Sequence, residues 1–381
     1  MKGKAAIAGL GITDMGRIYG KTATDFAAEA IKLALDDAGL KPTELDGLLV
    51  NSGVTNGIDI NLMNELGMRD VKLMNHMNSY GSTAGAMVQF AAMACAAGMA
   101  NAVACVFADA PLVPDVSTGS AYASASGQGF QTLYSAYGMF GAASLYAMSA
   151  RRHMELYGTK SEQFGAIAVS QREWALLNPK AQMKKPMTLA DHQTSRMIAE
   201  PLRLFDCCLV SNGGVAVIVT SAERARSLKQ PPVYVLGFGQ GHPGGREDED
   251  VRTGAYESGK TAMTMAGVTP NDIDVCEIYD CFTYTVLVTL EDYGFCGKGE
   301  GGSFVEGGRL GPGGSLPTNT GGGQLSSFYM WGMTPLSEAV IQARGQGGAR
   351  QAPKHDVVLV SGNGGVLDYH STLILSPHPN G

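Results

Sequence analysis

The chain has 381 residues, and at roughly 100–200 residues per domain this length predicts two or three domains. Hydrophobic residues make up 45% and charged residues 17%, which allows a large buried core and excludes general disorder. The formal net charge of −7, without basic runs, argues against a surface for nucleic acid or for an anionic membrane.

The seven cysteines show no metal-binding or disulfide pattern. None forms a C-x-x-C pair, and no histidine lies at ligand spacing from a cysteine, so we expect no metal site in this chain. Unpaired cysteines fit a reducing compartment. The apolar run from Ala5 to Leu10 is too short for a signal peptide, and no run reaches the about 20 residues that span a bilayer. We therefore expect a cytoplasmic, soluble protein.

The first predicted helix contains apolar residues from Phe26 to Leu35 at spacings of three and four. Gly39 supplies a left-handed C-cap, and Pro42 stops the helix from resuming. A strand-like run, residues 48–50, follows. Further along, an Ala/Met-rich helix over 85–98 precedes a strand over 102–107.

Residues 110–200 interrupt this alternation of strands and helices. They contain a stretch rich in Ser, Gly and Tyr, from Ser117 to Gly129, and we interpret them as an inserted loop domain. After a short helix at 222–227, the boundary between two halves falls near Leu228 to Pro232, before a strand over 233–238. Alternating strands and helices predict an α/β fold with mostly parallel sheets.

The second half repeats features of the first. Residues 38–46 read AGLKPTELD and residues 266–274 read AGVTPNDID, each after a helix and before a strand. A helix over 335–345 and a strand over 357–360 match the pair at 85–107. The repeat predicts duplicated halves, 1–230 and 231–381. Between its two matched segments the second copy is longer than the first, and the excess falls in residues 297–323, which hold twelve glycines and could form a lid, a docking surface or a plain surface loop.

Three glycine-rich turns are candidate ligand sites: residues 79–85, 319–326 and 361–365. Glycine allows close backbone approach to a ligand, and the N-terminus of a helix favours negative charge. The two halves and these turns together resemble the thiolase superfamily, in its sterol-carrier-protein-type, lipid-transfer-protein branch. The segments that carry the resemblance are residues 6–11, 204–214, 277–283 (EIYDCFT), 319–326 and 361–365. It implies two βαβαβ-type halves in a five-layered α-β-α-β-α core.

The departures from the thiolase pattern affect the catalytic positions. The nucleophilic cysteine of thiolases falls on Gly81 or Ser82, depending on a one-residue shift, and Cys95 lies too deep in its helix to replace it. The family's catalytic histidine falls on Tyr329, and the Asn or His of its oxyanion box falls on Tyr279. Claisen chemistry through an acyl-enzyme is therefore lost.

The pattern of a missing cysteine and a tyrosine at both of these positions resembles the cysteine-less steroid side-chain aldolases. That resemblance implies a retro-aldol cleavage of a 17-hydroxysteroid acyl-CoA to a 17-ketosteroid and propionyl-CoA or acetyl-CoA, with Tyr279 and Tyr329 as acid and base. A base role requires a tyrosine pKa lowered from about 10. The resemblance also implies a homodimer and a small OB-fold, zinc-ribbon partner that holds the zinc.

The same resemblance suggests a set of substrate-binding positions, namely Gly81, Ser82, Asp280, Asn319, Gly322, Gly323, Ser361, Gly362 and His370. Some roles stay open. Asp280 can act as a base or as a helix cap, and Ser82 as a nucleophile. Two other functions also remain: a non-catalytic lipid or acyl-CoA carrier, and a thiolase or acetyl-CoA acyltransferase with an unconventional nucleophile.

Overall fold

The computed structural model describes residues 1–55, 57–59, 61–123, 133–134, 136–139, 141–244 and 251–380. The first half begins with β1 (Ala5–Ile12), α1 (Ala23–Ala38), β2 (Gly47–Ser52), α2 (Leu62–Glu65), β3 (Leu73–His76), α3 (Thr83–Ala96) and β4 (Ala102–Asp109). It continues with α4 (Ser120–Ala123), α6 (Gly141–Tyr157), α7 (Ser161–Leu177), α8 (Leu189–Thr194), β5 (Met197–Ala199), β6 (Leu202–Arg203), β7 (Gly213–Ser221) and α9 (Ala222–Ala225).

The second half contains β8 (Val233–Gly241), α10 (Ala255–Ala266), β9 (Val275–Ile278), α11 (Thr283–Asp292), α12 (Gly301–Phe304), α13 (Met333–Ala343), β10 (Val358–Gly364) and β11 (Tyr369–Ser376). A π-helical turn, Gly323–Ser327, precedes α13.

The predicted repeat has the same structure in both halves. Helix α1 ends at Gly39 (φ 74°) and helix α10 ends at Gly267 (φ 71°), both in the left-handed conformation that glycine adopts without strain. In each case a 3₁₀ turn follows, Pro42–Glu44 or Pro270–Asp272, and then a buried strand. The residues that the two segments share thus specify a helix stop and the turn into the next strand.

Nine strands form one continuous sheet, in the order β3-β2-β4-β7-β1-β8-β11-β10-β9, and β5 and β6 form a separate two-stranded sheet among the described residues. The order of the second half mirrors that of the first, and the halves meet where β1 pairs with β8 at Ala6–Tyr234 and Ile7–Val233. The sheet is mixed, because β7 and β11 are antiparallel to both of their neighbours. The prediction of mostly parallel sheets was wrong: strands buried on both faces give no sequence signal for direction.

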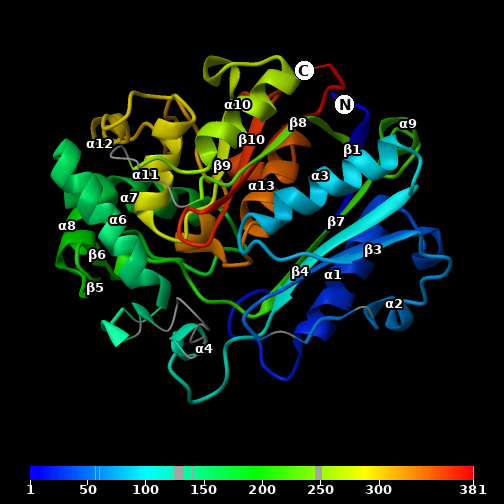
Figure 1. Ribbon diagram of the computed structural model, residues 1–381, viewed down its shortest axis with the longest axis horizontal. Coiled ribbons are helices and arrows are strands. Elements are labelled where there is room, and N and C mark those ends of the chain that lie inside the picture. Colours follow the sequence, from blue (N-terminus) through cyan, green and yellow to red (C-terminus); the bar gives the residue numbers. More distant parts are fainter. Residues whose placement is uncertain are drawn as a thin grey trace.

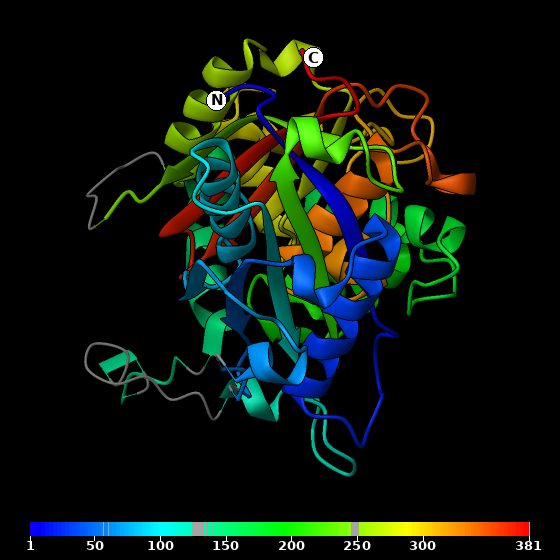
Figure 2. The ribbon, with the colours of Figure 1, turned by 90° about the vertical axis from the view of Figure 1, so that its right-hand side faces the viewer.

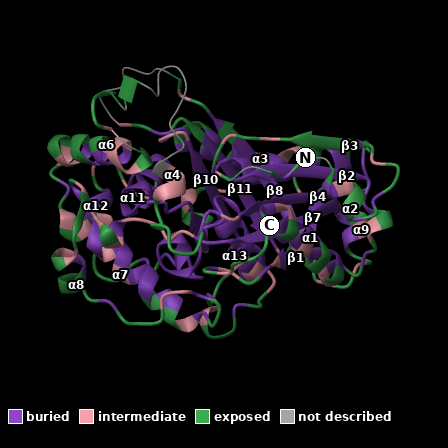
Figure 3. Ribbon diagram, turned by 90° about the horizontal axis from the view of Figure 1, so that it is seen from below, coloured by how far each residue is buried: buried purple, intermediate pink, exposed green. Residues whose placement is uncertain are grey.

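The helices form layers on both sides of the twisted sheet (Figures 1 and 2). Helix α1 packs on β1, β7 and β4, and helix α10 packs on β8 and β11. Helices α3 and α13 contact strands of both halves and form the central layer. This is the expected thiolase-like α/β arrangement, with one large mixed sheet, and the central strands and helices are the most buried part of the molecule (Figure 3).

The inserted region after β4 is mainly helical and lies beside α11 and α12 (Figure 1). Two buried histidine–carboxylate contacts fix it there: His153 of α6 to Glu291, at 3.0 Å, and His192 of α8 to Asp206, at 2.8 Å. Residues 124–132 of the predicted loop domain, including Gly129, lie outside the described residues. The domain boundaries remain predictions.

The glycine-rich segment 297–323 is partly buried rather than wholly exposed. Gly301, Gly302, Val305 and residues 316–323 lie inside the protein. Its end therefore belongs to the core. In the described part of the chain no helix is both long and apolar enough to cross a membrane.

Candidate active site

Tyr279 and Tyr329 meet in the interior of the protein. Their hydroxyl oxygens are 3.0 Å apart, a hydrogen-bond distance in which either can be the donor. Tyr279 is 4% exposed and Tyr329 is 9% exposed. The structure therefore brings together the two side chains predicted as catalytic, although they are 50 residues apart in the chain.

The backbone around each tyrosine is anchored. Tyr279 directly follows β9; its N–H donates to the carbonyl of Ser361 in β10 (3.0 Å), and its carbonyl accepts from the Thr285 hydroxyl (2.9 Å). Tyr329 lies between the 323–327 turn and α13, and its N–H donates to the Ser211 hydroxyl (3.1 Å). Fixed backbones hold the two phenols in one geometry.

Gly81 is the residue of the first glycine-rich turn that faces this pair. A Cβ atom on Gly81 would overlap ring carbons Cε2 and Cζ of Tyr279. The neighbouring Ser82 instead donates its hydroxyl to the carbonyl of Ser79 (3.0 Å). The phenol ring thus fills the space that a side chain at position 81 would occupy, and Ser82 is engaged within its own turn.

Two equivalent turns flank the site, one from each half of the chain. Tyr80 and Trp331 are both left-handed, at φ 52° and 46°, and each precedes a glycine at the start of α3 or α13. In each turn the N–H two residues before the glycine donates to a threonine hydroxyl, Thr83 at 2.7 Å or Thr334 at 2.9 Å. The Tyr80 and Trp331 rings lie 5.9 Å apart. Such strained backbone conformations cluster at functional sites.

The surroundings of the phenol pair disfavour charge. Burial raises the pKa of Tyr279 and of Tyr329 well above the usual 10, and neighbouring thiol and phenol groups raise it further. The lowered tyrosine pKa that a phenolate base would require is therefore not found, because desolvation outweighs the hydrogen bond that the two hydroxyls share. Both phenols are neutral and can donate a proton.

Asp280 acts as a cap. Its carboxylate accepts from the N–H groups of Gln324 (2.9 Å) and Leu325 (3.1 Å). It therefore caps the 323–327 turn, whereas α11 begins after Phe282. Burial raises the Asp280 pKa to about 7. Of the two roles left open by the sequence, the geometry supports the cap, although the capped turn is not the one that follows in the chain.

Asn319, Gly322 and Gly323 shape the same loop. Asn319 accepts from the N–H of Ile278 (2.7 Å), Gly322 lies against Ala175, and Gly323 lies against Asp280. Asp280, Asn319 and Gly323 line a cavity of about 30 Å³, room for about one water molecule.

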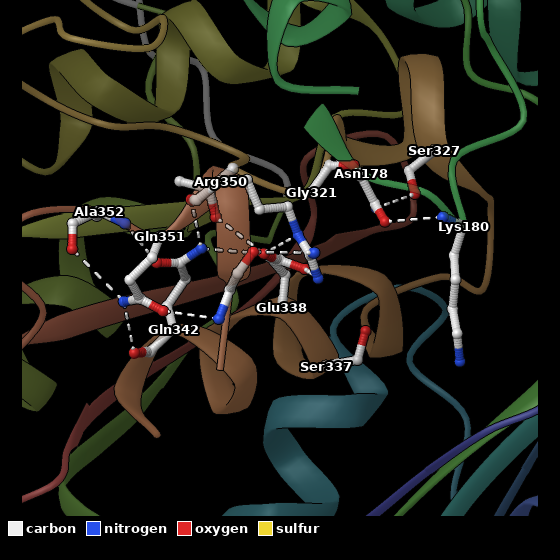
Figure 4. Close-up of polar contacts among 12 residues, drawn as sticks. Asn178, Lys180, Gly321, Ser327, Ser337, Glu338, Gln342, Arg350, Gln351 and Ala352 are labelled. Atoms are coloured by element: carbon white, nitrogen blue, oxygen red, sulfur yellow. Dashed lines mark hydrogen bonds and ion pairs between the residues drawn. The ribbon is translucent and has the colours of Figure 1, made fainter. Parts of the chain in front are cut away.

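Beside that cavity lies a network of polar side chains. Glu338 pairs with Arg350 at 2.8 Å and accepts from Gln342 at 3.1 Å (Figure 4). The contacts of Asn319, Gly322 and Gly323 are thus with the protein itself, in a space too small for an acyl-CoA.

Ser361 and His370 lie in a separate buried cluster. The Ser361 hydroxyl and His370 Nε2 are 2.8 Å apart, and Tyr293 lies 3.2 Å from the same nitrogen. His370 shares a face of β11 with Thr372, which contacts α10 through Ser258, so it points toward α10. Burial lowers the His370 pKa to about 3, which keeps the ring neutral. By contrast, Gly362 packs directly on Gly81 and Ser82.

Sequence reasoning missed two polar side chains at this site. Asn363 lies in the last glycine-rich turn, and its carbonyl would also overlap a Cβ on Gly81. Its amide nitrogen donates to the hydroxyl of Tyr146 on α6 at 3.1 Å. The Tyr146 ring packs on Phe282 with centroids 4.8 Å apart. Asn363 was visible as the polar residue among glycines, but nothing in the sequence indicated Tyr146.

The thiols are poorly suited to nucleophilic chemistry. All seven cysteines are free, and burial raises the pKa of every one, to about 12 for Cys95, Cys207 and Cys296. A thiolate, the reactive form, is therefore disfavoured at each position. Within the described residues no three His, Cys, Asp or Glu side chains converge as a metal site would require.

Comparison with known proteins agrees with this fold. The family model described as thiolase C-terminal domain-like matches residues 242–377. The 17-hydroxy-3-oxo-4-pregnene-20-carboxyl-CoA lyase of Mycobacterium tuberculosis is 39% identical, over 96% of this chain and 97% of its own length. The steroid side-chain-cleaving aldolase of Thermomonospora curvata is 38% identical, over 96% of each chain.

A solved structure described as an Ltp2-ChsH2(DUF35) aldolase superimposes with a TM-score of 0.89 at 38% identity, over 98% of both chains. The layered α/β fold is that of the thiolase class. The chain belongs to the thiolase superfamily, close to its steroid side-chain-cleaving aldolases.

Proposed function

We propose that the protein is an acyl-CoA aldolase that cleaves the side chain of a 17-hydroxysteroid β-hydroxyacyl-CoA, releasing a 17-ketosteroid and propionyl-CoA or acetyl-CoA. The observation that carries this proposal is the 3.0 Å contact between the Tyr279 and Tyr329 hydroxyls beside Gly81. The relatives named as a lyase and as an aldolase of steroid side chains support it.

A neutral phenol pair can move one proton without forming a phenolate as a stable species. As the Cα–Cβ bond breaks, its electrons pass to the thioester enolate, and the electrons of the hydroxyl O–H bond form the new ketone. One phenol takes the hydroxyl proton while giving its own to the second, and the second protonates Cα. The proton count balances, and no charge accumulates in a site where burial disfavours charge.

The two alternatives have less support. A thiolase needs a nucleophile, but Gly81 has no side chain and the pKa of each cysteine is raised. A non-catalytic carrier needs no buried pair of hydroxyls in contact with one another. Iodoacetamide should therefore leave turnover largely unchanged, whereas it would inactivate an enzyme that depends on a thiolate.

We propose that the chain works as a homodimer together with a small OB-fold, zinc-ribbon protein. The edge strand β3 supports the first part, since three of its four residues are exposed and its outer edge is open to pairing. The solved relative described with a DUF35 chain supports the second. Zinc would belong to that partner, and this chain would need no cofactor besides its CoA thioester substrate.

The test uses the chain co-expressed with its DUF35-type partner and incubated with 17-hydroxy-3-oxo-4-pregnene-20-carboxyl-CoA. Mass spectrometry should detect the ketosteroid and propionyl-CoA in equal amounts. Tyr279→Phe and Tyr329→Phe should each lower kcat by about 10²–10⁴-fold, the usual contribution of a general acid or base. Substrate dissociation constants should stay within about threefold. Turnover by both variants at the wild-type rate would reject the proposal.

A further inference from the structure

The side-chain amide of Asn363 has one polar atom in a hydrogen bond and one without a partner. Asn363 is 1% exposed, and its Nδ2 donates to the Tyr146 hydroxyl at 3.1 Å. Among the described residues, no group donates to its Oδ1. Nearly all buried polar atoms in native proteins are hydrogen-bonded, so an unpartnered acceptor at a catalytic site requires an explanation.

The contact with Tyr146 engages the nitrogen of the Asn363 side-chain amide. Tyr146 comes from α6 of the inserted region and is itself held against Phe282. If Asn363 served only as a tether for α6, a hydroxyl or amine donor would suffice and no acceptor would be left buried. The tether uses Nδ2 and leaves Oδ1 available to a donor on a ligand.

The position of Asn363 limits which donor this is. Its backbone carbonyl lies against Gly81, next to the Tyr279 ring, and its side chain contacts Tyr146, so the residue lies beside the phenol pair. The substrate hydroxyl gives its proton to the phenol pair in the proposed reaction. The thioester carbonyl and sulfur carry no hydrogen to donate. The next donor along an acyl-CoA is the pantetheine amide N–H, two methylene groups from the sulfur.

We propose that Asn363 is a positioning residue: its Oδ1 accepts a hydrogen bond from the first pantetheine amide N–H and so aligns the thioester with Tyr279 and Tyr329. The inference rests on the proposed function only in taking an acyl-CoA thioester as the ligand. It assigns a role to an amide that the thiolase-like motifs do not explain.

The experiment compares two ligands that differ in one donor. Both are thioesters of 3-oxo-4-pregnene-20-carboxylic acid, which lacks the 17-hydroxyl and cannot be cleaved. One carries N-acetylcysteamine, and the other carries the isosteric 2-acetoxyethanethiol, in which oxygen replaces N–H. Dissociation constants are measured by calorimetry on the complex with its partner. Wild type should prefer the amide by about three- to tenfold, the range of one net hydrogen bond.

The variants separate this contact from a structural role. Asn363→Leu should lower the preference to about one, whereas Asn363→Asp, which keeps an oxygen acceptor, should retain it. Asn64→Leu, on the exposed helix α2, should behave as wild type. If Asn363→Leu does not fold, equal affinities of wild type for the two ligands would still overturn the proposal.

Equal affinities of wild type for the two ligands, or an unchanged preference in Asn363→Leu, would overturn the proposal. Because neither ligand reacts, the result does not depend on whether the aldol cleavage occurs. Failure of the proposed function would appear separately, as absence of cleavage in the presence of a measurable amide preference.

Discussion

A Cβ atom on Gly81 would overlap atoms Cε2 and Cζ of the Tyr279 ring. This steric exclusion separates the site from that of a thiolase. A cysteine at position 81 and a phenol at position 279 cannot share the space without movement of one of them. Loss of the nucleophile and gain of the tyrosine are therefore a single change in packing as well as in chemistry. Because the Ser82 hydroxyl donates to the carbonyl of Ser79, we propose Gly81 rather than Ser82 as the position of the thiolase nucleophile.

Restoring a cysteine should not restore a thiolase. Gly81→Cys should displace the Tyr279 ring, lower kcat for steroid cleavage by about 10²-fold and destabilise the fold by about 1–3 kcal/mol, as overpacking does. No acetyl transfer should appear. The measurements are kcat and urea unfolding, with Gly119→Ala as the control, because a Cβ on Gly119 meets no atom within 4 Å. Acetyl transfer by Gly81→Cys would contradict this account.

The raised tyrosine pKa values predict the pH dependence of the rate. Because both folded-state pKa values lie well above 10, neither phenol ionises between pH 7 and pH 9. The Tyr279 and Tyr329 ionisations should therefore add no rising limb to the kcat profile in that range. A limb that rises with pH in wild type and vanishes in Tyr279→Phe or Tyr329→Phe would instead indicate a phenolate base.

At the scale of elements, Asp280 connects the two segments that carry the tyrosines. It follows Tyr279 in the chain, and its carboxylate accepts from the N–H groups near the start of the 323–327 turn. This turn ends two residues before Tyr329. Tyr279, at the end of β9, thus supplies one phenol, and Asp280 fixes the loop that leads to the second phenol, Tyr329. This explains why an acidic residue is tolerated in a fully buried position.

Removing that connection should affect both stability and rate. Asp280→Ala should leave two buried N–H groups without an acceptor, lowering the free energy of unfolding by about 3 kcal/mol. It should also lower kcat by about 10²-fold through displacement of Tyr329. Asp280→Asn keeps an acceptor and should therefore retain more of the stability and more of the rate than Asp280→Ala. Urea unfolding and steady-state kinetics check this, and equal kcat in Asp280→Ala and wild type would refute the connection.

The Asp280 titration predicts a specific pH dependence of stability. Its folded pKa of about 7 lies above the unfolded value of about 3.9, so the unfolded state loses its proton first as pH rises. Wild-type stability relative to Asp280→Asn should therefore fall between pH 4 and pH 7. Urea unfolding of both proteins at pH 4, 5.5 and 7 measures the difference. If wild type instead became more stable relative to Asp280→Asn as the pH rises from 4 to 7, this prediction would be contradicted.

At the scale of the molecule, the duplication accounts for most of what the sequence predicted. The AG-x-x-P segments specify a left-handed helix stop and a proline turn, which are local, so both copies fold as expected. The turns at Tyr80 and Trp331 repeat the same geometry with different residues, and only the structure reveals them as a pair. Strand direction was mispredicted because buried strands such as β7 are apolar on both faces.

The location of site residues was predictable where a motif position decides it, as for Tyr279, Tyr329 and, to within one residue, Gly81 or Ser82. It was not predictable where a partner comes from elsewhere in the chain. Tyr146 approaches from the inserted region, and His370 turns toward α10 because of strand alternation. The sign of the tyrosine pKa shifts also depends on burial by surrounding layers, which no local pattern of residues encodes.

Single turnover in D₂O, with wild type and the two phenylalanine variants in the partner complex, tests the phenol pair most directly. We predict that wild type releases propionyl-CoA with one solvent deuterium at its α-carbon, together with the ketosteroid, and does so after iodoacetamide treatment. Tyr279→Phe and Tyr329→Phe should bind the substrate and form less than about 1% of either product in the same time. Cleavage within tenfold of wild type by the Tyr279→Phe/Tyr329→Phe double variant would contradict the account.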